Sequence, residues 1–303
     1  MLKQIVAYFL PVTNYTPEFY KGVPKWMHPL YLKKVYKYIV GEELDLKNPK
    51  RLTEKIQWIK LYDNLPIKSD YCDKLTCRDL VRSKIPEINF AHIYGAWDSF
   101  KEIDFSVCPK SFFLKTNHAS KAMIRIRDKD RFISLPQELE KAASIMDRWL
   151  SISYDTVSAF EQQYKGIKPK IYAEECLGGA ELQRLSDYKI FCFNGEPKFI
   201  EYFIELKPKR IQMAVFDADW NIQEFYHSAD KYDGLPISRP GNFDKMLEYA
   251  KILSSDFKFV RVDLFDVDNK IYFGEMTFTP SSGFMNYVPK KYDEILGSLL
   301  KLK

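Results

Sequence analysis

The chain has 303 residues, of which 46% are hydrophobic and 16% aromatic, and its formal net charge is +5. This length and aromatic content exclude a disordered chain and allow one large domain or two ordinary ones. The modest charge suits anionic small molecules, and the lack of dense basic tracts excludes a dedicated nucleic-acid-binding protein.

The first ten residues combine a lysine with a short apolar run, as a weak signal sequence does. Because the run is short and no small-residue cleavage site follows it, we expect a packed helix, with peripheral membrane contact through residues 5–10 as the open alternative. No segment approaches the roughly 20 apolar residues that cross a bilayer. The cysteines lack the paired short spacings of zinc and redox sites, which predicts a reduced, cytoplasmic protein. They are Cys72, Cys77, Cys108, Cys176 and Cys192.

Residues 1–108 are predicted to form a mainly helical N-terminal region. Residues 30–40 are rich in Tyr, Leu and Lys, and residues 52–61 place isoleucines at helical spacing behind Thr53, a suitable N-cap. Residues 70–81 continue in the same style. These segments predict connected helices rather than a sheet.

From Pro109 the pattern changes to short β runs. Residues 111–116 and 123–127 predict strands, and residues 136–150 predict a helix with one apolar stripe. Residues 170–177 predict a strand that ends at a pair of glycines.

The second half of the chain predicts antiparallel hairpins. Residues 188–193 and 197–203 flank Asn194-Gly195, the strongest short-range hairpin signal in the sequence, and residues 242–253 predict a helix. Hairpins interleaved with helices predict an α+β fold.

Residues 259–277 predict a further hairpin, with carboxylates on one face. If its loop has three residues, Asp263 lies opposite Glu275 and Arg261 opposite Thr277, whereas a two-residue loop breaks this register. Like charges directly opposite destabilise a sheet unless a cation offsets them. Mg²⁺ is such a cation, since it takes one or two carboxylates plus phosphate oxygens. A solvated hairpin face with a local arginine–carboxylate pair is the alternative for this segment alone.

The motifs that carry chemistry occur in a recognisable order along the chain. They are residues 51–63 with Glu54-Lys-Ile-Gln-Trp58, Lys115-Thr-Asn-His118, Asp187-Tyr-Lys-Ile-Phe-Cys-Phe-Asn-Gly195 and Phe273-Gly-Glu-Met-Thr-Phe-Thr-Pro-Ser-Ser-Gly-Phe284. Their order resembles the ATP-grasp superfamily, and their residues look like its TupA-like branch, which is associated with bacterial capsule, surface-polysaccharide and teichuronopeptide synthesis. The resemblance implies ATP held between two α+β lobes, residues 109–175 and residues 176–303.

By this resemblance, two lysines meet the nucleotide. Lys115 and Lys189 match the family's basic positions at the phosphates, where a lysine acts as a compact point charge. Asn117 and His118 match the loop that folds over phosphate, and His118 could donate to a phosphate oxygen or to the acceptor carboxylate. A structural hydrogen bond is the alternative for His118.

The hinge on which adenine sits is matched by Glu174, Glu175, Cys176 and Leu177. The resemblance implies that backbone groups near Cys176 and Leu177 read the adenine edge and that Glu174 faces the nucleotide. Asp187 would accept hydrogen bonds from the ribose hydroxyls. An ordinary strand-end acid is the alternative for both Glu174 and Asp187.

The metal site of the family is matched by Asp263 and Glu275, and Arg261 matches the arginine near the transferring phosphate. Thr277 stands where many ATP-grasp proteins have asparagine, and its hydroxyl can still bind Mg²⁺ or hold a metal-bound water.

The sequence departs from the family in the phosphate loop. Residues 119–122, Ala-Ser-Lys-Ala, stand where relatives usually carry glycines that let backbone N–H groups approach phosphate. We therefore expect a stiffer loop in which Lys121 supplies charge in place of backbone donors. Residues 279–283 predict a turn with hydroxyls and N–H groups, a candidate cradle for the acceptor carboxylate or for phosphate.

The resemblance implies an enzyme: an ATP-dependent carboxylate–amine ligase that uses Mg²⁺ and acts through an acyl phosphate. Its partners would be a small-molecule or saccharide carboxylate and an amine donor, without nucleic acid. The expected location is the cytoplasm, with peripheral contact at the inner membrane face, where lipid-linked glycan is made, as an open alternative.

Three other functions stay open on the sequence. A kinase of the same fold would stop at a phosphorylated product. A metal-dependent glycosyltransferase is suggested by Asp266-Val-Asp268 and Asp217-Ala-Asp219, although both tripeptides lie near predicted turns, where aspartate is common. A non-catalytic scaffold is suggested by the missing loop glycines.

Overall fold

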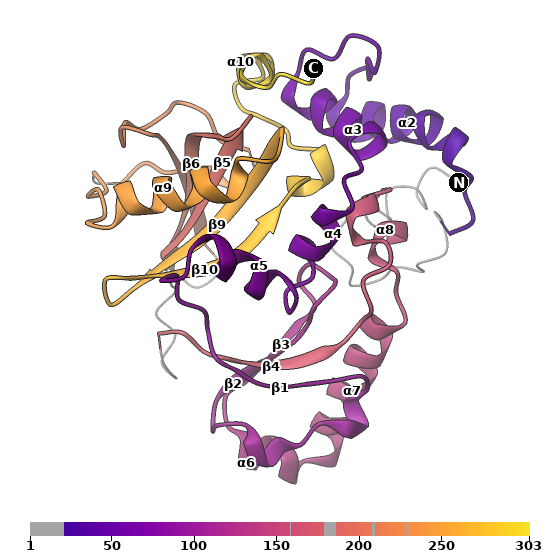
Figure 1. Ribbon diagram of the computed structural model, residues 1–303, viewed down its shortest axis with the longest axis vertical. Coiled ribbons are helices and arrows are strands. Elements are labelled where there is room, and N and C mark those ends of the chain that lie inside the picture. The colour runs from indigo at the N-terminus through magenta and orange to yellow at the C-terminus, as the bar shows by residue number, and fades with distance from the viewer. Residues whose placement is uncertain (1–20, 158, 179–185, 208–209, 228, 235) are drawn as a thin grey trace.

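The computed structural model describes residues 21–157, 159–178, 186–207, 210–227, 229–234 and 236–303. In this part of the chain the strands form two sheets, which we call the small sheet, of four strands, and the large sheet, of six. Figure 1 shows the large sheet with α9 at the upper left, the small sheet with α6 and α7 below, and α4 and α5 between them. The predicted α+β class is confirmed, and the helix predicted at residues 5–10 lies outside the described residues.

The elements have the following bounds. The helices are α2 (His28–Val40), α3 (Leu52–Tyr62), α4 (Ile67–Cys72), α5 (Cys77–Lys84), α6 (Lys129–Ser134), α7 (Pro136–Leu150), α8 (Tyr154–Val157), α9 (Phe243–Ser254) and α10 (Lys291–Leu299), with 3₁₀ turns η1 (Lys25–Met27), η2 (Phe100–Glu102), η3 (Phe105–Val107), η4 (Gln162–Tyr164) and η5 (Pro280–Gly283). The strands are β1 (Ile93–Trp97), β2 (Phe112–Thr116), β3 (Met123–Ile126), β4 (Ile171–Glu175), β5 (Ser186–Phe193), β6 (Glu196–Lys207), β7 (Arg210–Asp217), β8 (Asp230–Lys231), β9 (Phe259–Val267) and β10 (Lys270–Thr277). None of the helices described is both long and apolar enough to cross a membrane.

The small sheet is antiparallel, in the order β1-β4-β2-β3. Its inner face packs on α7, with Phe112, Leu114 and Ile171 against Ala142 and Met146. The sequence predicts β2, β3, β4 and α7 but not β1, whose residues lack a buried face and a period-two pattern. The small sheet therefore starts inside the region predicted to be mainly helical, and the predicted domain bounds stay a prediction.

The large sheet has the order β10-β9-β5-β6-β7-β8. One face packs on α9, with Ile190, Val262 and Leu264 against Met246. Because side chains alternate along a strand, the neighbours of these residues, among them Asp263, lie on the opposite face. The predicted Asn194-Gly195 turn joins β5 to β6.

The β9–β10 hairpin reaches the predicted register by an unexpected route. Its loop has two residues, Asp268 and Asn269, with φ of 52° and 60°, so the predicted three-residue loop is wrong. A bulge at Gly274 adds one residue to β10 and restores the register, so that Asp263 still lies opposite Glu275. A β-carbon on Gly274 would lie 2.8 Å from Asp263 O, which is why glycine is required there.

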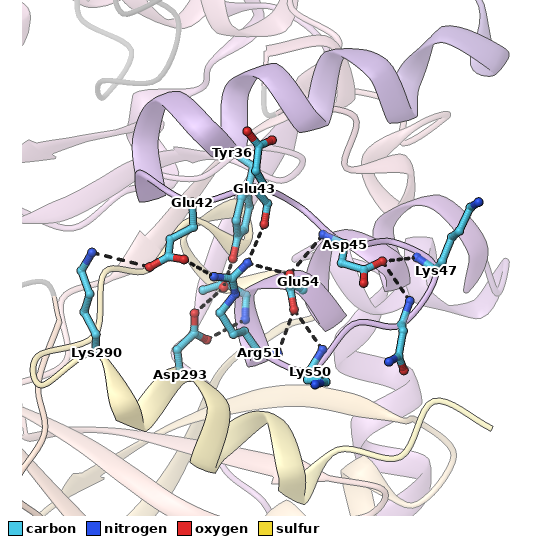
Figure 2. A network of polar contacts seen from close by, with 12 residues as sticks. Tyr36, Glu42, Glu43, Asp45, Lys47, Lys50, Arg51, Glu54, Lys290 and Asp293 are labelled. Atoms are coloured by element: carbon cyan, nitrogen blue, oxygen red, sulfur yellow. Dashed lines mark hydrogen bonds and ion pairs between the residues drawn. The ribbon is translucent and has the colours of Figure 1, made fainter.

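A polar network fastens α3 to α10 and to the loop after α2 (Figure 2). Arg51 donates to Glu54 at 2.7 Å and to Glu42 at 2.6 Å, and Glu54 accepts from the Arg51 N–H at 3.0 Å. Asp293 of α10 accepts from Thr53 N at 2.9 Å and from Thr53 Oγ1 at 2.5 Å. Thr53 is therefore not the N-cap that the sequence predicts. Arg51 holds that position, and Asp293 satisfies an N–H of the first turn of α3.

We expect Gly297→Ala to lower the free energy of unfolding by about 3 kcal/mol, because it overpacks the contact between α10 and α3. A β-carbon at Gly297 would lie 2.0 Å from Lys50 O and 2.7 Å from Leu52 N. Gly241→Ala is the matched control, since no heavy atom lies within 4 Å of its β-carbon position. Urea denaturation of the two variants measures the difference. Equal stability of both would show that α10 does not pack this closely on α3.

Candidate functional site

An acidic pair lies on the face of the large sheet that α9 leaves uncovered. Asp263 of β9 is opposite Glu275 of β10 on one side and Lys189 of β5 on the other. Arg261 donates Nε–H to Asp263 Oδ1 and Nη2–H to Oδ2, both at 2.6 Å, and reaches Glu275 Oε1 at 3.1 Å. Lys189 Nζ lies 2.8 Å from Asp263 Oδ2 and 2.7 Å from Asp187 Oδ2. The structure thus brings these five predicted residues together.

Thr277 lies at the same edge. Its Oγ1 accepts a hydrogen bond from Arg261 at 3.1 Å and donates one to Glu275 Oε1 at 3.0 Å. The predicted register, with Arg261 opposite Thr277, is confirmed by the strand pairing.

Burial sets the electrostatics of this cluster. Asp263 is 1% exposed, and burial raises its pKa, although Arg261 and Lys189 oppose the rise. Burial disfavours the charge of Arg261 and of Lys189, yet Asp263 raises the pKa of each above its usual value. Both cations therefore stay charged beside Asp263, and their positive charge stabilises the acid pair.

Lys74, in the turn between α4 and α5, completes the cluster from outside the sheet. Burial disfavours the charge of Glu275, but Lys74, Arg261 and Lys189 together lower its pKa to about 2. The Lys74 ammonium donates to Ala119 O. Sequence reasoning missed this residue, because a single lysine in a turn belongs to no motif.

The small sheet presents a polar face of its own. Lys115 of β2 forms an ion pair with Glu174 of β4, and Arg78 Nη1 lies 3.8 Å from Glu174 Oε1. Burial lowers the pKa of Lys74. Glu275 raises this pKa and Lys115 lowers it, but the effect of burial is the largest. Lys74 is therefore bound to the loop after β2 and interacts electrostatically with Glu275 of the large sheet.

Asn117 and His118 turn into the protein. Both are almost fully buried, at 1% and 2% exposure. Asn117 Nδ2 donates to Asp73 Oδ1 at 2.9 Å, and His118 Nε2 donates to Trp149 O at 3.1 Å and to Ile152 O at 3.2 Å. Burial lowers the pKa of His118, which favours the neutral ring. These contacts agree with the structural alternative for His118, and its catalytic role stays a prediction.

The loop without glycines has an ordered geometry. It is closed by a hydrogen bond from Thr116 N to Ala122 O at 3.0 Å. Ala119 and Ala122 are buried, whereas Lys121 is exposed and has a φ of 59°, the left-handed conformation that glycine adopts most easily. Lys121 thus takes the backbone role of a glycine while offering its ammonium to solvent.

The predicted hinge lies where the chain leaves the small sheet. Glu175 is tied to the segment before β1, since its N–H donates to His92 O at 2.9 Å and its Oε2 accepts from His92 N at 3.0 Å. Cys176 and Leu177 follow directly and are half-buried. A fixed Glu175 positions the backbone of both residues.

Glu275, Asp263 and Lys189 are cross-strand neighbours, and Glu201 on the next strand extends this charged row. Sequence reasoning missed Glu201 too. Glu201 of β6 lies opposite Lys189 and is 1% exposed. Its Oε1 is 2.5 Å from His227 Nε2, and the His227 ring lies edge-on to Tyr287 with centroids 5.3 Å apart. β6 also contains Glu196 and Glu205, so no local signal in the sequence distinguishes Glu201. The structure alone connects Glu201 and His227 to the row.

The turn after β10 has an unusual backbone. Ser281, Ser282 and Gly283 have φ of 48°, 52° and 72°, a left-handed run that costs about 1–3 kcal/mol per non-glycine residue. Lys60 Nζ donates to Ser282 O at 3.1 Å and to Ser282 Oγ at 2.9 Å, and Gln57 Nε2 donates to Gly283 O at 2.9 Å. Burial lowers the pKa of Lys60 to about 7. Helix α3 therefore fixes the shape of the candidate cradle.

The acid pair fits a magnesium ion in the chemistry of its donors. Mg²⁺ takes oxygen ligands, usually one or two carboxylates. The Glu275 side chain is 39% exposed, and its Oε2 makes no hydrogen bond to a described residue. Asp187 Oδ1 is buried and also lacks a described partner, which suits an acceptor for a ribose hydroxyl. Among the described residues no group of three or more His, Cys, Asp or Glu side chains is placed to bind a metal.

Each of the two Asp-x-Asp tripeptides runs from the end of a strand, β7 or β9, into a turn. Asp217 Oδ1 accepts from the N–H groups of Asp219 at 3.0 Å and Asn221 at 2.8 Å, as a turn-forming aspartate does. Asp268 forms the β9–β10 loop, and Asp266 lies next to the end of β9. These positions match the turn interpretation.

Comparison with known proteins gives one family match. The family model described as TupA-like ATPgrasp matches residues 54–301. No curated protein matches the chain. Among solved structures, the D-alanine–D-alanine ligase of Helicobacter pylori is 13% identical with a TM-score of 0.41, covering 83% of this chain and 70% of that one.

Two further solved structures are similarly distant. The D-alanine–D-alanine ligase of Bacillus anthracis is 15% identical with a TM-score of 0.43, covering 75% of this chain and 64% of that one. The ATP-grasp ligase PsnB, complexed with a minimal precursor, is 10% identical with a TM-score of 0.38 and 70% of this chain covered. The chain spans 54% of the length of PsnB.

We expect Glu275 to stabilise the fold in a pH-dependent way. Its pKa in the folded protein, about 2, lies below the usual value of 4.5, so its contribution is present above about pH 4.5 and is lost as the pH falls towards 2. The difference in unfolding free energy between the wild type and Glu275→Gln should therefore shrink from about pH 5 to about pH 3. Urea denaturation across this range measures it.

The same measurement in a protein that carries Lys74→Met is the control. Lys74 is the cation that most lowers the pKa of Glu275, so its removal should make the stability difference caused by Glu275→Gln vary less with pH. A difference that does not change with pH in the wild-type background would contradict the lowered pKa.

Proposed function

Because the chain belongs to the TupA-like ATP-grasp family, we propose that it is an ATP-dependent ligase that joins a carboxylate to an amine. In this reaction an acceptor carboxylate oxygen attacks the γ-phosphorus of ATP, ADP leaves, and an acyl phosphate forms. The amine nitrogen then attacks the acyl carbon, loses a proton and displaces phosphate. The observation that carries the proposal is the opposed pair Asp263 and Glu275, held by cations from both sides.

Phosphoryl transfer requires positioning and neutralisation of the charge that spreads over the γ-phosphate. Arg261 and Lys189 lie on the acid pair, at 2.6 Å and 2.8 Å from Asp263. Lys74 interacts electrostatically with Glu275 and with Lys115. These cations occupy buried or half-buried positions, where charge interactions are stronger than in water. They are the groups to which we assign phosphate binding.

Asp263 and Glu275 would hold Mg²⁺, with Thr277 as a ligand or as the holder of a bound water. The ion would supply Lewis-acid stabilisation and a template for the phosphate oxygens. Arg261 opposes the rise that burial causes in the pKa of Asp263, and it orients the carboxylate through its two hydrogen bonds.

We propose that the nucleotide is bound by the hinge residues and by one acid. Backbone groups of Cys176 and Leu177 would read the adenine edge, next to Glu175, which is fixed by His92. Asp187 would accept from the ribose with its unpaired Oδ1.

Within this proposal the acceptor binds at the turn of residues 279–283, whose backbone is shaped by Lys60 and Gln57. The family's association with surface polymers favours a carboxylated sugar or peptide as acceptor in bacterial polysaccharide synthesis. The cytoplasm is the compartment that supplies ATP. A kinase that stops at a phosphorylated product remains the second candidate, since it needs the same phosphate site.

We expect Asp263→Asn and Glu275→Gln to lower Mg²⁺-dependent ADP release by at least about a hundredfold while the fold is retained. ADP release is measured with candidate carboxylates, with and without an amine. Amine-dependent turnover identifies the ligase, and turnover without amine identifies the kinase. Wild-type turnover in either variant would show that the metal assignment is wrong.

Asp266→Asn is the matched control for these variants. It removes a nearby carboxylate on β9 that belongs to the Asp-x-Asp tripeptide and not to the acid pair. The ligase should keep its turnover in this variant. A metal-dependent glycosyltransferase would instead lose activity and would release a nucleoside diphosphate from a sugar donor.

We expect Cys176→Pro to weaken ATP binding about tenfold, because proline removes the N–H that we assign to the adenine edge. Cys176→Ala keeps the N–H and should bind ATP like the wild type. Calorimetry gives the dissociation constants. Equal affinity of the two variants would place the adenine elsewhere.

A further inference from the structure

One face of η1 and α2 is basic and aromatic and points to solvent. Residues 21–40 contain five lysines and no aspartate or glutamate. Trp26 is 73% exposed and Leu30 is 53% exposed. We call the set Trp26, Leu30, Lys33, Lys34 and Lys37 the α2 outer face.

Helix geometry puts these residues on one side. Within α2, the residues Leu30, Lys33, Lys34 and Lys37 follow the spacing i, i+3, i+4 and i+7, which is a single stripe at 3.6 residues per turn. Trp26 lies in η1, directly before the helix. The opposite side of α2 is buried, with Leu32, Tyr36 and Val40 in a core that includes Phe160. The fold therefore uses the inner stripe, and the exposed tryptophan and leucine of the outer stripe contribute nothing to that core.

The positive charge of the α2 outer face is largely uncompensated by described acids. Lys33 and Lys34 are exposed and form no ion pair with a described residue, whereas Lys37 is paired with Glu43. The next acid, Glu42, is already bound by Arg51 at 2.6 Å. Two lysines thus remain available beside Trp26 and Leu30.

We propose that the α2 outer face binds the surface of a membrane that contains anionic lipids. A tryptophan and a leucine beside lysines are the residues of an interfacial helix, since the rings and apolar chains enter the headgroup region while the lysines meet lipid phosphates. Figure 1 shows α2 at the periphery of the molecule, at the upper right, away from both sheets. The surface therefore lies apart from the phosphate-binding residues, and its use is independent of the proposed ligase activity.

Cosedimentation of the full chain with lipid vesicles tests the proposal. We expect binding to vesicles of phosphatidylcholine mixed with phosphatidylglycerol, weaker binding to phosphatidylcholine alone, and a loss of binding as salt is raised. On binding, the fluorescence of Trp26 should shift to shorter wavelength, and this shift should be absent in Trp26→Ser.

Charge reversal at two lysines of the α2 outer face tests whether this surface binds the vesicles. Lys33→Glu combined with Lys34→Glu should weaken binding to the anionic vesicles by at least about tenfold. Lys101→Glu combined with Lys141→Glu makes the same change in net charge at exposed positions near the small sheet, and should bind within about twofold of wild type. Circular dichroism checks that both double variants are folded.

The outcomes separate a lipid surface from other anionic partners. Vesicle binding that is equal in the wild type and in the Lys33→Glu, Lys34→Glu variant overturns the proposal. Absence of vesicle binding by the wild type also overturns it, including the case in which soluble polyglutamate or a single-stranded oligonucleotide binds instead. Loss of ligase activity in other variants does not bear on either result.

Discussion

The repulsion between two carboxylates that face each other across adjacent strands is the constraint on which the rest of the site depends. Burying Asp263, which is 1% exposed, without compensation would cost several kcal/mol. Asp263 and Glu275 are compensated by Arg261 and Lys189 within the large sheet and by Lys74 from the turn between α4 and α5. Because the third cation comes from a distant part of the chain, the helical region and the sheet must be assembled together before the cluster is electrostatically balanced. The cations that stabilise the two acids in the absence of a ligand are also the groups that would bind a phosphate.

Register explains how the two acids come to face each other at all. A two-residue loop at Asp268 and Asn269 would by itself offset β10 by one residue relative to the register with a three-residue loop, and every side chain beyond it would change face. The bulge at Gly274 returns Glu275 to the face of Asp263. The close approach of Gly274 to Asp263 O allows no larger residue without a shift of the strand. A single glycine thus determines whether the acid pair exists.

The sequence predicts the parts of this protein that are encoded locally. Alternation and turn residues were sufficient for the strands β2 to β6, for the β9–β10 hairpin, and for α7 and α9. They placed Asp263 opposite Glu275 only through a three-residue loop, whereas the structure reaches that register with a two-residue loop and a bulge at Gly274. The local sequence pattern does not predict β1, whose residues become a strand only through pairing with β4. It could not give Lys74 or Glu201 either, since their roles arise from contacts with strands far away in the chain. His118 shows the reverse case, in which a motif position is occupied but the ring is turned towards Trp149 O and Ile152 O.

The loop of residues 116–122, the candidate phosphate loop, shows what replaces the glycines that relatives usually carry there. Glycines would give such a loop freedom to close over a nucleotide and backbone donors to bind it. Here the loop is anchored from outside, because Asp73 binds the Asn117 side chain and Lys74 binds both Asn117 O, through its N–H, and Ala119 O. An anchored loop loses little entropy on binding, and the lysine that anchors it also lowers the pKa of Glu275. Residues 73 and 74 therefore link the order of the loop to the charge of the acid pair, so the turn between α4 and α5 is coupled to both parts of the candidate site and does more than connect two helices.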